Sequence, residues 1–484
     1  MGLYNYNVNG SYEQRYMAKI NKVTGDTRQT ELIGTSDNTN DVVTDSQNNL
    51  SVWNDSILTK YNRFNTNDVL WRKNLSTALP NSADQISHAY LNNEGQLILL
   101  GRKTVGSNYH TVFKINPQTG NIIWSTKIES TFLLTGVNFK RMKEDDDYLY
   151  YLFGHSGVGS VISKVYLVKI NKNTGALIWL TNHSPAQVNG MSMAYNRAAL
   201  DFDFSCDNYI SATGYYGSSN YEPGTWFVMN IDKTTGAKLN DFTEMLNNYA
   251  GPDYNSVGKV NWSTPTRSLA YGTLNEVGYD TWARRVEFNP ATGVKISDER
   301  VDAEFSNQSY VVQMDRFGDT NYVLKQHGND LVIEARNNLD SLIWKTNYID
   351  TGSVVVGLFD VSASYVGAVI SYKKYPTLPM NGTPTVTHTR YLVFSRATGA
   401  LINSILQTVG STDFSYREVE VNETNMLICY KQAGIQYIKR WTYGTTTSGA
   451  VTTLHGEYLK EGSLLNIMVS YDANYYIGVI FGGR

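Results

Sequence analysis

Acidic side chains gather in two short segments where a cation could bind. The run EDDD at Glu144–Asp147 would attract a cation or a basic partner, and it is equally typical of a solvated turn between strands. DFDFSCD at Asp201–Asp207 loosely has the spacing of a calcium loop, but it lacks the glycine of the sharp turn. Its alternation of Asp and Phe also fits a strand with Phe inward and Asp outward. We therefore expect no metal site.

Cysteine and histidine show no redox or zinc pattern. The two cysteines, Cys206 and Cys429, are too far apart in the sequence for a disulfide framework, and we expect both to be buried thiols. The seven histidines are scattered singly, without the close pairs of zinc sites. The sequence contains no G-x-S-x-G elbow, phosphate loop or H-E-x-x-H motif. It predicts no catalytic residue and no bound cofactor.

Tyrosine, with 35 copies, is the most distinctive residue type. YYLFGHSGVG and TGYYGSSNYEPGTW place tyrosines beside glycines, where we expect loops between strands, although tyrosine is also an ordinary strand residue. The segment Tyr372–Arg390 reads as an unusually long insertion and carries three of the 10 prolines, which is typical of an interaction loop. The candidate binding residues from these segments are Tyr215, Tyr216, Tyr221, Tyr375, Met380 and Asn381.

The charge balance argues against polyanionic partners. The 41 basic and 44 acidic residues of this 484-residue chain give a net charge of −3, without the basic excess that nucleic acids or membrane surfaces attract. The chain begins MGLYNYNVNG and contains no apolar run long enough to span a bilayer. We expect neither a signal peptide nor membrane insertion.

A repeated phrase organises the whole sequence. INPQTGNIIW ends at Trp124 and INKNTGALIW ends at Trp179, and copies without the Thr-Gly pair end at Trp71 and Trp344. Glycine supplies the positive φ of a tight hairpin, and the tryptophan falls in the following strand, where it would pack against the neighbouring repeat. The residues expected to dock the repeats onto one another are Trp71, Trp124, Trp179, Trp344, Gly120 and Gly175.

Each repeat has room for four short strands. In one copy, VNFKRM, YLYYLFG, VYLVKI and ALIWLT are separated by polar turns, which predicts a meander of antiparallel strands. Such sheets, repeated radially, form a β-propeller. We predict an all-β chain with one propeller domain over residues 1–484, with nine blades by repeat count and eight as the alternative. Residues 1–36 and 460–484 would share the blade that closes the ring, and the other blades would lie within 37–459.

The segments Asn116–Trp124 and Asn171–Trp179 resemble the Asp-x-x-Thr-Gly-x-x-x-Trp docking repeat of propellers of the pyrroloquinoline-quinone type, and the resemblance covers nearly the whole chain. It implies the propeller fold. Dehydrogenases of that family hold their quinone between a tryptophan and a disulfide of adjacent cysteines, with calcium nearby. Cys206 and Cys429 are not adjacent, and this difference from the dehydrogenase pattern favours a non-enzymatic branch of the family. A similar outer-membrane assembly lipoprotein would need a lipidated N-terminal cysteine, which this chain lacks.

Composition suggests a role in assembly or attachment. Scarce cysteine, abundant Tyr, Asn, Thr and Gly, and an N-terminal sequence without a signal peptide favour a structural or receptor-binding protein of a bacteriophage virion, and within the virion they favour the tail. Its partners would be other virion proteins or a host-surface glycan or protein. The alternatives are a bacterial propeller that binds proteins or glycans, in the cytoplasm or on the surface by a leaderless route, and an enzyme that is either quinoprotein-like or glycan-cleaving.

Overall fold

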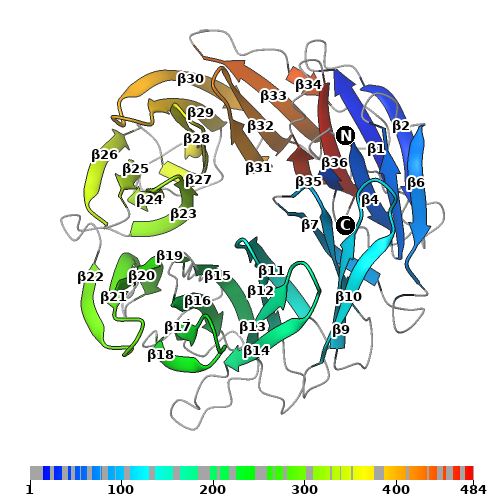
Figure 1. Cartoon of the computed structure of the whole chain (residues 1–484). Coiled ribbons are helices and arrows are strands. Elements are labelled where there is room, and N and C mark those ends of the chain that lie inside the picture. The colour runs from blue at the N-terminus through cyan, green and yellow to red at the C-terminus, as the bar shows by residue number, and fades with distance from the viewer. Residues whose placement is uncertain are drawn as a thin grey trace. The chain divides into compact units, whose positions relative to one another are not determined.

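The structure is a computed structural model of the 484-residue chain (Figure 1). It describes residues 15–21, 27–34, 42–44, 49–54, 56–62, 68–76, 78, 85–92, 94–102, 109–129, 137–155, 164–183, 197–203, 208–216, 225–245, 259–264, 267–275, 281–300, 309–327, 330–337, 340–349, 353–374, 386–409, 414–432, 435–443, 451–453, 462–468 and 475–482. Within these ranges the regular secondary structure consists of β-strands.

The strands pair into nine four-stranded sheets over the described ranges, and neighbouring strands run antiparallel. The chain divides into two compact units, and unit 2 consists of Val105–Tyr109 and Ile128–Ile349. Its four sheets follow the chain in order: β11 (Val137–Glu144), β12 (Tyr148–His155), β13 (Lys164–Asn171), β14 (Leu177–His183); β15 (Arg197–Asp203), β16 (Tyr209–Tyr216), β17 (Thr225–Asp232), β18 (Lys238–Met245); β19 (Lys259–Thr264), β20 (Arg267–Asn275), β21 (Thr281–Phe288), β22 (Lys295–Arg300); β23 (Ser309–Phe317), β24 (Thr320–His327), β25 (Asp330–Arg336), β26 (Leu342–Ile349).

Unit 1 consists of Met1–Thr104, His110–Lys127 and Asp350–Arg484. Four of its sheets are formed by consecutive strands: β3 (Val42–Thr44), β4 (Leu50–Asn54), β5 (Ile57–Tyr61), β6 (Val69–Asn74); β7 (Gln85–Leu91), β8 (Leu97–Arg102), β9 (Tyr109–Ile115), β10 (Ile122–Glu129); β27 (Ser353–Val361), β28 (Tyr365–Lys374), β29 (Val386–Ser395), β30 (Leu401–Val409); β31 (Phe414–Val421), β32 (Asn425–Gln432), β33 (Ile435–Thr442), β34 (Val451–Thr453).

Both ends of the chain build the remaining sheet of unit 1. Its strand order is β2 (Thr27–Gly34), β1 (Arg15–Asn21), β36 (Tyr475–Gly482), β35 (Gly462–Met468). β1 and β36 run antiparallel in the register Ala18 to Gly478 and Lys19 to Ile477, and lie side by side in Figure 1. The N-terminal hairpin and the C-terminal strand pair therefore depend on each other for sheet hydrogen bonds.

The third and fourth strands of several sheets are joined by the same tight turn. The amide of Gly120 donates to the carbonyl of Asn116 at 2.8 Å, and Gly175 repeats this bond to Asn171 at 2.9 Å. Both glycines have a positive φ, of 70° and 75° respectively, which only glycine adopts readily. The side chain of Asn171 accepts hydrogen bonds from two amides inside its turn, so the turn is fixed locally by its own sequence.

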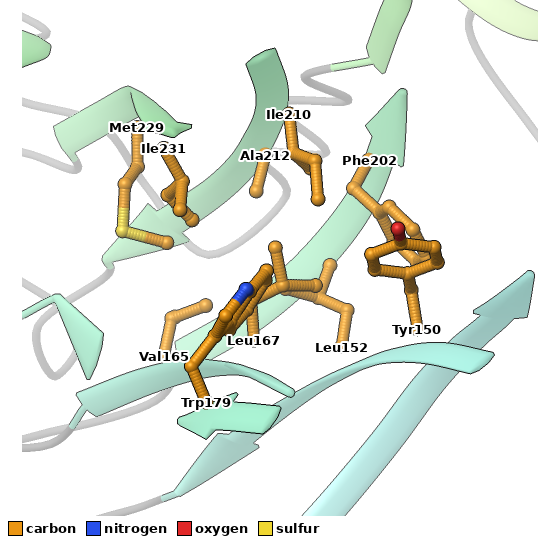
Figure 2. Close-up of a cluster of buried hydrophobic side chains, with 10 residues drawn as sticks. All are labelled: Tyr150, Leu152, Val165, Leu167, Trp179, Phe202, Ile210, Ala212, Met229 and Ile231. Carbon is orange, nitrogen blue, oxygen red and sulfur yellow. The ribbon is translucent and has the colours of Figure 1, made fainter. Parts of the chain in front are cut away.

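Apolar side chains fill the junctions between successive sheets. In unit 2, side chains of the β11–β14 and β15–β18 sheets interdigitate (Figure 2), and this cluster consists of Tyr150, Leu152, Val165, Leu167, Trp179, Phe202, Ile210, Ala212, Met229 and Ile231. In unit 1, a second cluster joins the β3–β6 and β7–β10 sheets, and a third joins the β27–β30 and β31–β34 sheets. Burial of these faces stabilises the junctions between neighbouring sheets.

The prediction of an all-β chain of four-stranded antiparallel sheets is confirmed. One local prediction is wrong: Tyr150 and Tyr151 are buried in β12, and Tyr215 and Tyr216 lie within β16 rather than in a loop. The glycines that follow these tyrosines suggested loops, but the strands continue to the ends of the tyrosine pairs because their backbones pair with both neighbouring strands. In the described ranges, no helix has the length and apolar character needed to cross a membrane.

Candidate functional site

The repeated tryptophans contact the tight turn of the following sheet. The indole Nε1 of Trp71, in β6, donates to the carbonyl oxygen of Pro117 at 3.0 Å. Lys60 lies opposite Trp71 in the ladder, and its Nζ donates to the same oxygen at 2.6 Å. A lysine and a tryptophan on adjacent strands thus converge on one carbonyl of the Asn116–Gly120 turn.

The same arrangement recurs in unit 2. Trp179 Nε1 and Lys169 Nζ donate to the carbonyl of Lys233 at 3.3 Å and 2.8 Å, and Lys169 pairs with Trp179 in the ladder. Trp179 is only 8% exposed, and its ring lies against Gly236 and Tyr150. Its N–H and its packing surface are both engaged in the junction between the two sheets.

A polar pair replaces the lysine and tryptophan in the next junction. Asn240 stands four residues after Gly236, in the tryptophan position, and its Nδ2 donates to the carbonyl of Pro290 at 2.7 Å. Asn230 stands in the lysine position and donates to Asn240 Oδ1 at 2.6 Å. The contact with the turn carbonyl is therefore preserved when the aromatic ring is lost, which explains how the repeat tolerates sequence drift.

The other docking tryptophans are also buried. Trp124 is 8% exposed and Trp344 is 7% exposed, and the ring of Trp344 lies 6.1 Å from that of Tyr322. In the turn before Trp344 the glycine is replaced by Asp340, which has a φ of 62°. This is the one non-glycine residue with positive φ within the described part of the chain.

The acidic run forms a structured turn between β11 and β12. The carboxylate of Asp145 accepts hydrogen bonds from the amides of Asp147 and Tyr148 and, at 2.8 Å, from the hydroxyl of Tyr150. Lys233 Nζ, from the next turn-bearing repeat, lies 3.5 Å from the same carboxylate. Burial raises the pKa of Asp145, but these hydrogen bonds and the nearby lysine outweigh it and hold the pKa below its ordinary value. The charge of Asp145 is thus used to hold two sheets together.

The other titratable groups of this cluster are also held by burial and by neighbouring side chains. Burial and the Asp145 carboxylate raise the pKa of Tyr150 above its ordinary value, so its phenol stays protonated. Lys169 Nζ lies 3.9 Å from the ring centroid of Tyr148, where the ammonium is held by a cation–π contact. Within the described residues, no group of three or more His, Cys, Asp or Glu side chains could hold a metal ion.

A second repeated feature faces solvent on the fourth strand of the sheets. The two residues before each docking tryptophan are branched aliphatics, and in β14 Leu177 and Ile178 are 40% and 42% exposed. The strands concerned lie at the ends of their sheets. The equivalent exposed pairs in other sheets are Val69 and Leu70, Ile122 and Ile123, Leu342 and Ile343, and Leu401 and Ile402. This surface was not predicted from the sequence, although the repeated phrases IIW, LIW and VLW contain the residues that form it.

The predicted binding residues remain separated or undescribed. Tyr221, Tyr375, Met380 and Asn381 lie outside the described residues. Tyr215 and Tyr216 are placed by their backbone at the end of β16, where they pair with Trp226 and Thr225 of β17.

The acidic and cysteine candidates are only partly described. Asp201 and Asp203 lie in β15 on either side of the buried Phe202, as expected for a strand, and Asp207 lies outside the described residues. Cys206 is likewise outside them, and Cys429 lies in β32.

No family model and no curated protein matches the sequence. Several solved structures are similar to the chain at low identity. BamB from Moraxella catarrhalis is 15% identical with a TM-score of 0.37, and the match covers 71% of this chain and 87% of that one. The quinohemoprotein alcohol dehydrogenase from Comamonas testosteroni is 11% identical with a TM-score of 0.35, covering 90% and 78%. The WD40 domain of SCAP from fission yeast is 9% identical with a TM-score of 0.36, covering 84% and 96%.

Proposed function

We propose that this chain is a non-catalytic β-propeller that serves as a structural or receptor-binding protein of a bacteriophage virion, in the tail. The observation that carries the proposal is the repetition of solvent-exposed aliphatic pairs on the end strands of the sheets. Repeated apolar contacts at equivalent positions suit attachment to a neighbouring protein, because each pair adds buried area to an interface. The docking tryptophans are already engaged inside the sheet junctions.

The finer architecture belongs to the same proposal. The nine four-stranded sheets of the described residues would be the blades of one propeller, and the sheet made from both chain ends would close its ring. Class averages of the purified protein viewed along the ring axis, by electron cryomicroscopy, would count the blades. An eight-bladed or open assembly would overturn this part of the proposal and leave the binding role to be tested separately.

The assignment to a virion rests on composition and is tested on particles. Mass spectrometry of purified phage from a host that carries this gene should detect the chain at a level comparable to known tail proteins. Its absence from intact particles, combined with its presence in the host fraction, would favour the bacterial binding protein instead.

The exposed aliphatic pairs can be tested by substitution. Leu177→Glu with Ile178→Glu places two charges on the exposed part of β14, where surface changes cost roughly 0.5 kcal/mol or less in folding stability. We expect the variant to melt like the native protein but to be lost from assembled particles. Asn182→Glu, an exposed polar site in the same strand, is the matched control and should be incorporated normally.

The proposal that the chain is non-catalytic can be tested separately. The purified chain is incubated with pyrroloquinoline quinone and calcium, and dye reduction is measured with a panel of alcohols. Turnover above the protein-free background would overturn the proposal and favour the quinoprotein alternative. A glycan array with product analysis separates glycan binding, which the proposal allows, from glycan cleavage, which it does not.

A further inference from the structure

Charged side chains gather at the junction between the β19–β22 and β23–β26 sheets of unit 2. Asp340, in the turn before β26, is 5% exposed, and its carboxylate Oδ2 lies 2.9 Å from Arg285 of β21. This ion pair links the two sheets. The β11–β14 and β15–β18 sheets of the same unit meet through a cluster of buried apolar side chains as well as through the Asp145–Lys233 ion pair. The Arg285–Asp340 contact lacks the alignment of a hydrogen bond. A buried ion pair contributes little net stability, but removal of one partner leaves a costly buried charge.

Asp340 occupies a backbone position that elsewhere belongs to glycine. Its φ of 62° matches the positive φ of Gly120, Gly175, Gly236 and Gly293 in the corresponding turns. A residue with a side chain is strained in this conformation by about 1 kcal/mol or more. The turn therefore carries a local cost that glycine would remove, and what the aspartate adds is a carboxylate that reaches Arg285.

The β23–β26 sheet contains a second unfavourable feature, a buried asparagine. Asn321, at the start of β24, is 1% exposed, and neither Nδ2 nor Oδ1 of its side chain finds a hydrogen-bond partner among the described residues. Asn321 lies opposite Arg336 in the ladder, and Arg336 Nη1 in turn donates to the carbonyl of Asp340 at 3.0 Å. An unpaired buried amide costs roughly 1–3 kcal/mol, so the sheet carries a second local cost close to Asp340.

Several other charges surround the pair. Glu334 is buried between Lys325, at 2.6 Å, and Arg336, at 2.9 Å. Burial raises the pKa of Glu334, but these two cations outweigh it and lower the pKa below its ordinary value. The charged side chains that face Arg285 and Asp340 from the strands around them are Arg267 of β20, Glu287 of β21, Glu299 of β22, Lys325 of β24, and Glu334 and Arg336 of β25.

From these contacts we infer that the Arg285–Asp340 ion pair is an acid-sensitive latch that holds the β19–β22 and β23–β26 sheets together and releases them when the carboxylates of the junction are protonated. Protonation of Asp340 and Glu334 leaves Arg285, Arg336 and Lys325 as like charges without their carboxylate partners. The junction between the β11–β14 and β15–β18 sheets also has an ionic contact, between Asp145 and Lys233 at 3.5 Å, but its buried apolar cluster does not depend on protonation. This inference is independent of the proposed virion role.

Hydrogen exchange of the purified full-length chain tests the latch. Protection factors, corrected for the intrinsic pH dependence of exchange, are compared at pH 7 and pH 3.5 for β23, which packs against the β19–β22 sheet, and for β12 and β16. We expect protection in β23 to fall at least 100-fold further at the acidic pH than protection in β12 and β16. An equal loss in all three strands would mean global unfolding, and no loss in β23 would mean no latch; either result overturns the inference.

Two variants separate the latch from simple loss of stability. Asp340→Asn removes the charge but keeps a residue that tolerates positive φ, so β23 should be poorly protected already at pH 7. Arg285→Met with Asp340→Gly removes both charges and restores the glycine turn, so β23 should stay protected at both pH values. A double variant that remains as acid-sensitive as the native chain would also refute the latch.

Discussion

Trp179 of one sheet occupies the space that a side chain on Gly236 of the next sheet would need. A Cβ built on Gly236 would lie 2.5 Å from Cγ of the indole, and Gly236 has a φ of 74°. The glycine is required for two independent reasons, the turn conformation and the close approach of the ring. The Thr-Gly and Trp parts of the repeat are therefore two halves of one contact, made between successive sheets.

Replacing Trp179 by alanine should destabilise unit 2 by roughly 3–5 kcal/mol, because a buried aromatic side chain and its hydrogen bond to Lys233 are lost together. The measurement is the urea midpoint followed by circular dichroism. Asn182→Ala, at an exposed site of the same strand, should change the midpoint very little. A Trp179→Ala midpoint within error of the native value would show that the indole does not contribute to docking.

Gly236→Ala should lower the free energy of unfolding more than a glycine substitution that introduces backbone strain alone. Gly318 supplies the control, since it has a φ of 59° and a Cβ added there would meet nothing within 4 Å. Gly318→Ala should cost about 1 kcal/mol from backbone strain alone. In the Trp179→Ala background the cost of Gly236→Ala should fall toward that value, because the clash is gone. Additive costs in this double-mutant cycle would contradict the contact.

His110, buried in β9, should make the folded state sensitive to mild acid. Burial lowers its pKa from 6.5 to about 3, whereas the unfolded chain binds the proton near pH 6.5. The unfolded state thus binds more protons between these values, and stability falls as the pH drops through this window, by about 1.4 kcal/mol per pH unit. His110→Leu should remove this contribution in urea titrations carried out between neutral pH and about pH 4. Asp146→Asn, at an exposed carboxyl, should show the same loss of stability with falling pH as the native protein.

Lys439 lies fully buried in β33, with its ammonium 5.4 Å from the ring centroid of Tyr391. Burial lowers its pKa from 10.5 to about 8, so the folded state binds fewer protons than the unfolded state between these values and gains stability as the pH rises through that window. Lys439→Met should therefore raise the melting temperature at pH 7, and the difference should shrink toward pH 10.5. Lys295→Met, at an exposed site, should show no such trend. A pH-independent difference would contradict the titration.

The terminal sheet predicts a cross-link between distant parts of the sequence. Lys19 and Ile477 are paired in the β1–β36 ladder, so Lys19→Cys with Ile477→Cys should form a disulfide under mild oxidation. Closing so long a loop should stabilise the chain by on the order of 5 kcal/mol in the chain-entropy account. Thr30→Cys with Ile477→Cys is the control, because Thr30 pairs with Ala18 of β1 and is one strand further away. Equal cross-linking of both pairs would contradict the register.

The sequence predicted the features that depend on local chemistry. The turns at Asn116–Gly120 and Asn171–Gly175 and the strands after them follow from neighbouring residues, so the four-stranded sheets could be predicted. The latch could not be predicted, because Arg285 and Asp340 lie in different repeats and meet only through the packing of two sheets. Likewise, no sequence pattern showed that Lys60 and Trp71 would share one acceptor on Pro117.

The sheet formed by β1 and β36 also constrains the order of folding. β1 cannot gain its second neighbour until β36 has been synthesised, almost at the other end of the chain. Among the strand pairings of the described residues, this one has the longest sequence separation, so its loop-closure entropy cost is the largest and it should form slowly. Until β36 has been synthesised, one edge of β1 has no neighbouring strand, and such an edge can pair with other chains. Ribosome-bound chains that stop before residue 462 should therefore be more prone to association than the 484-residue chain.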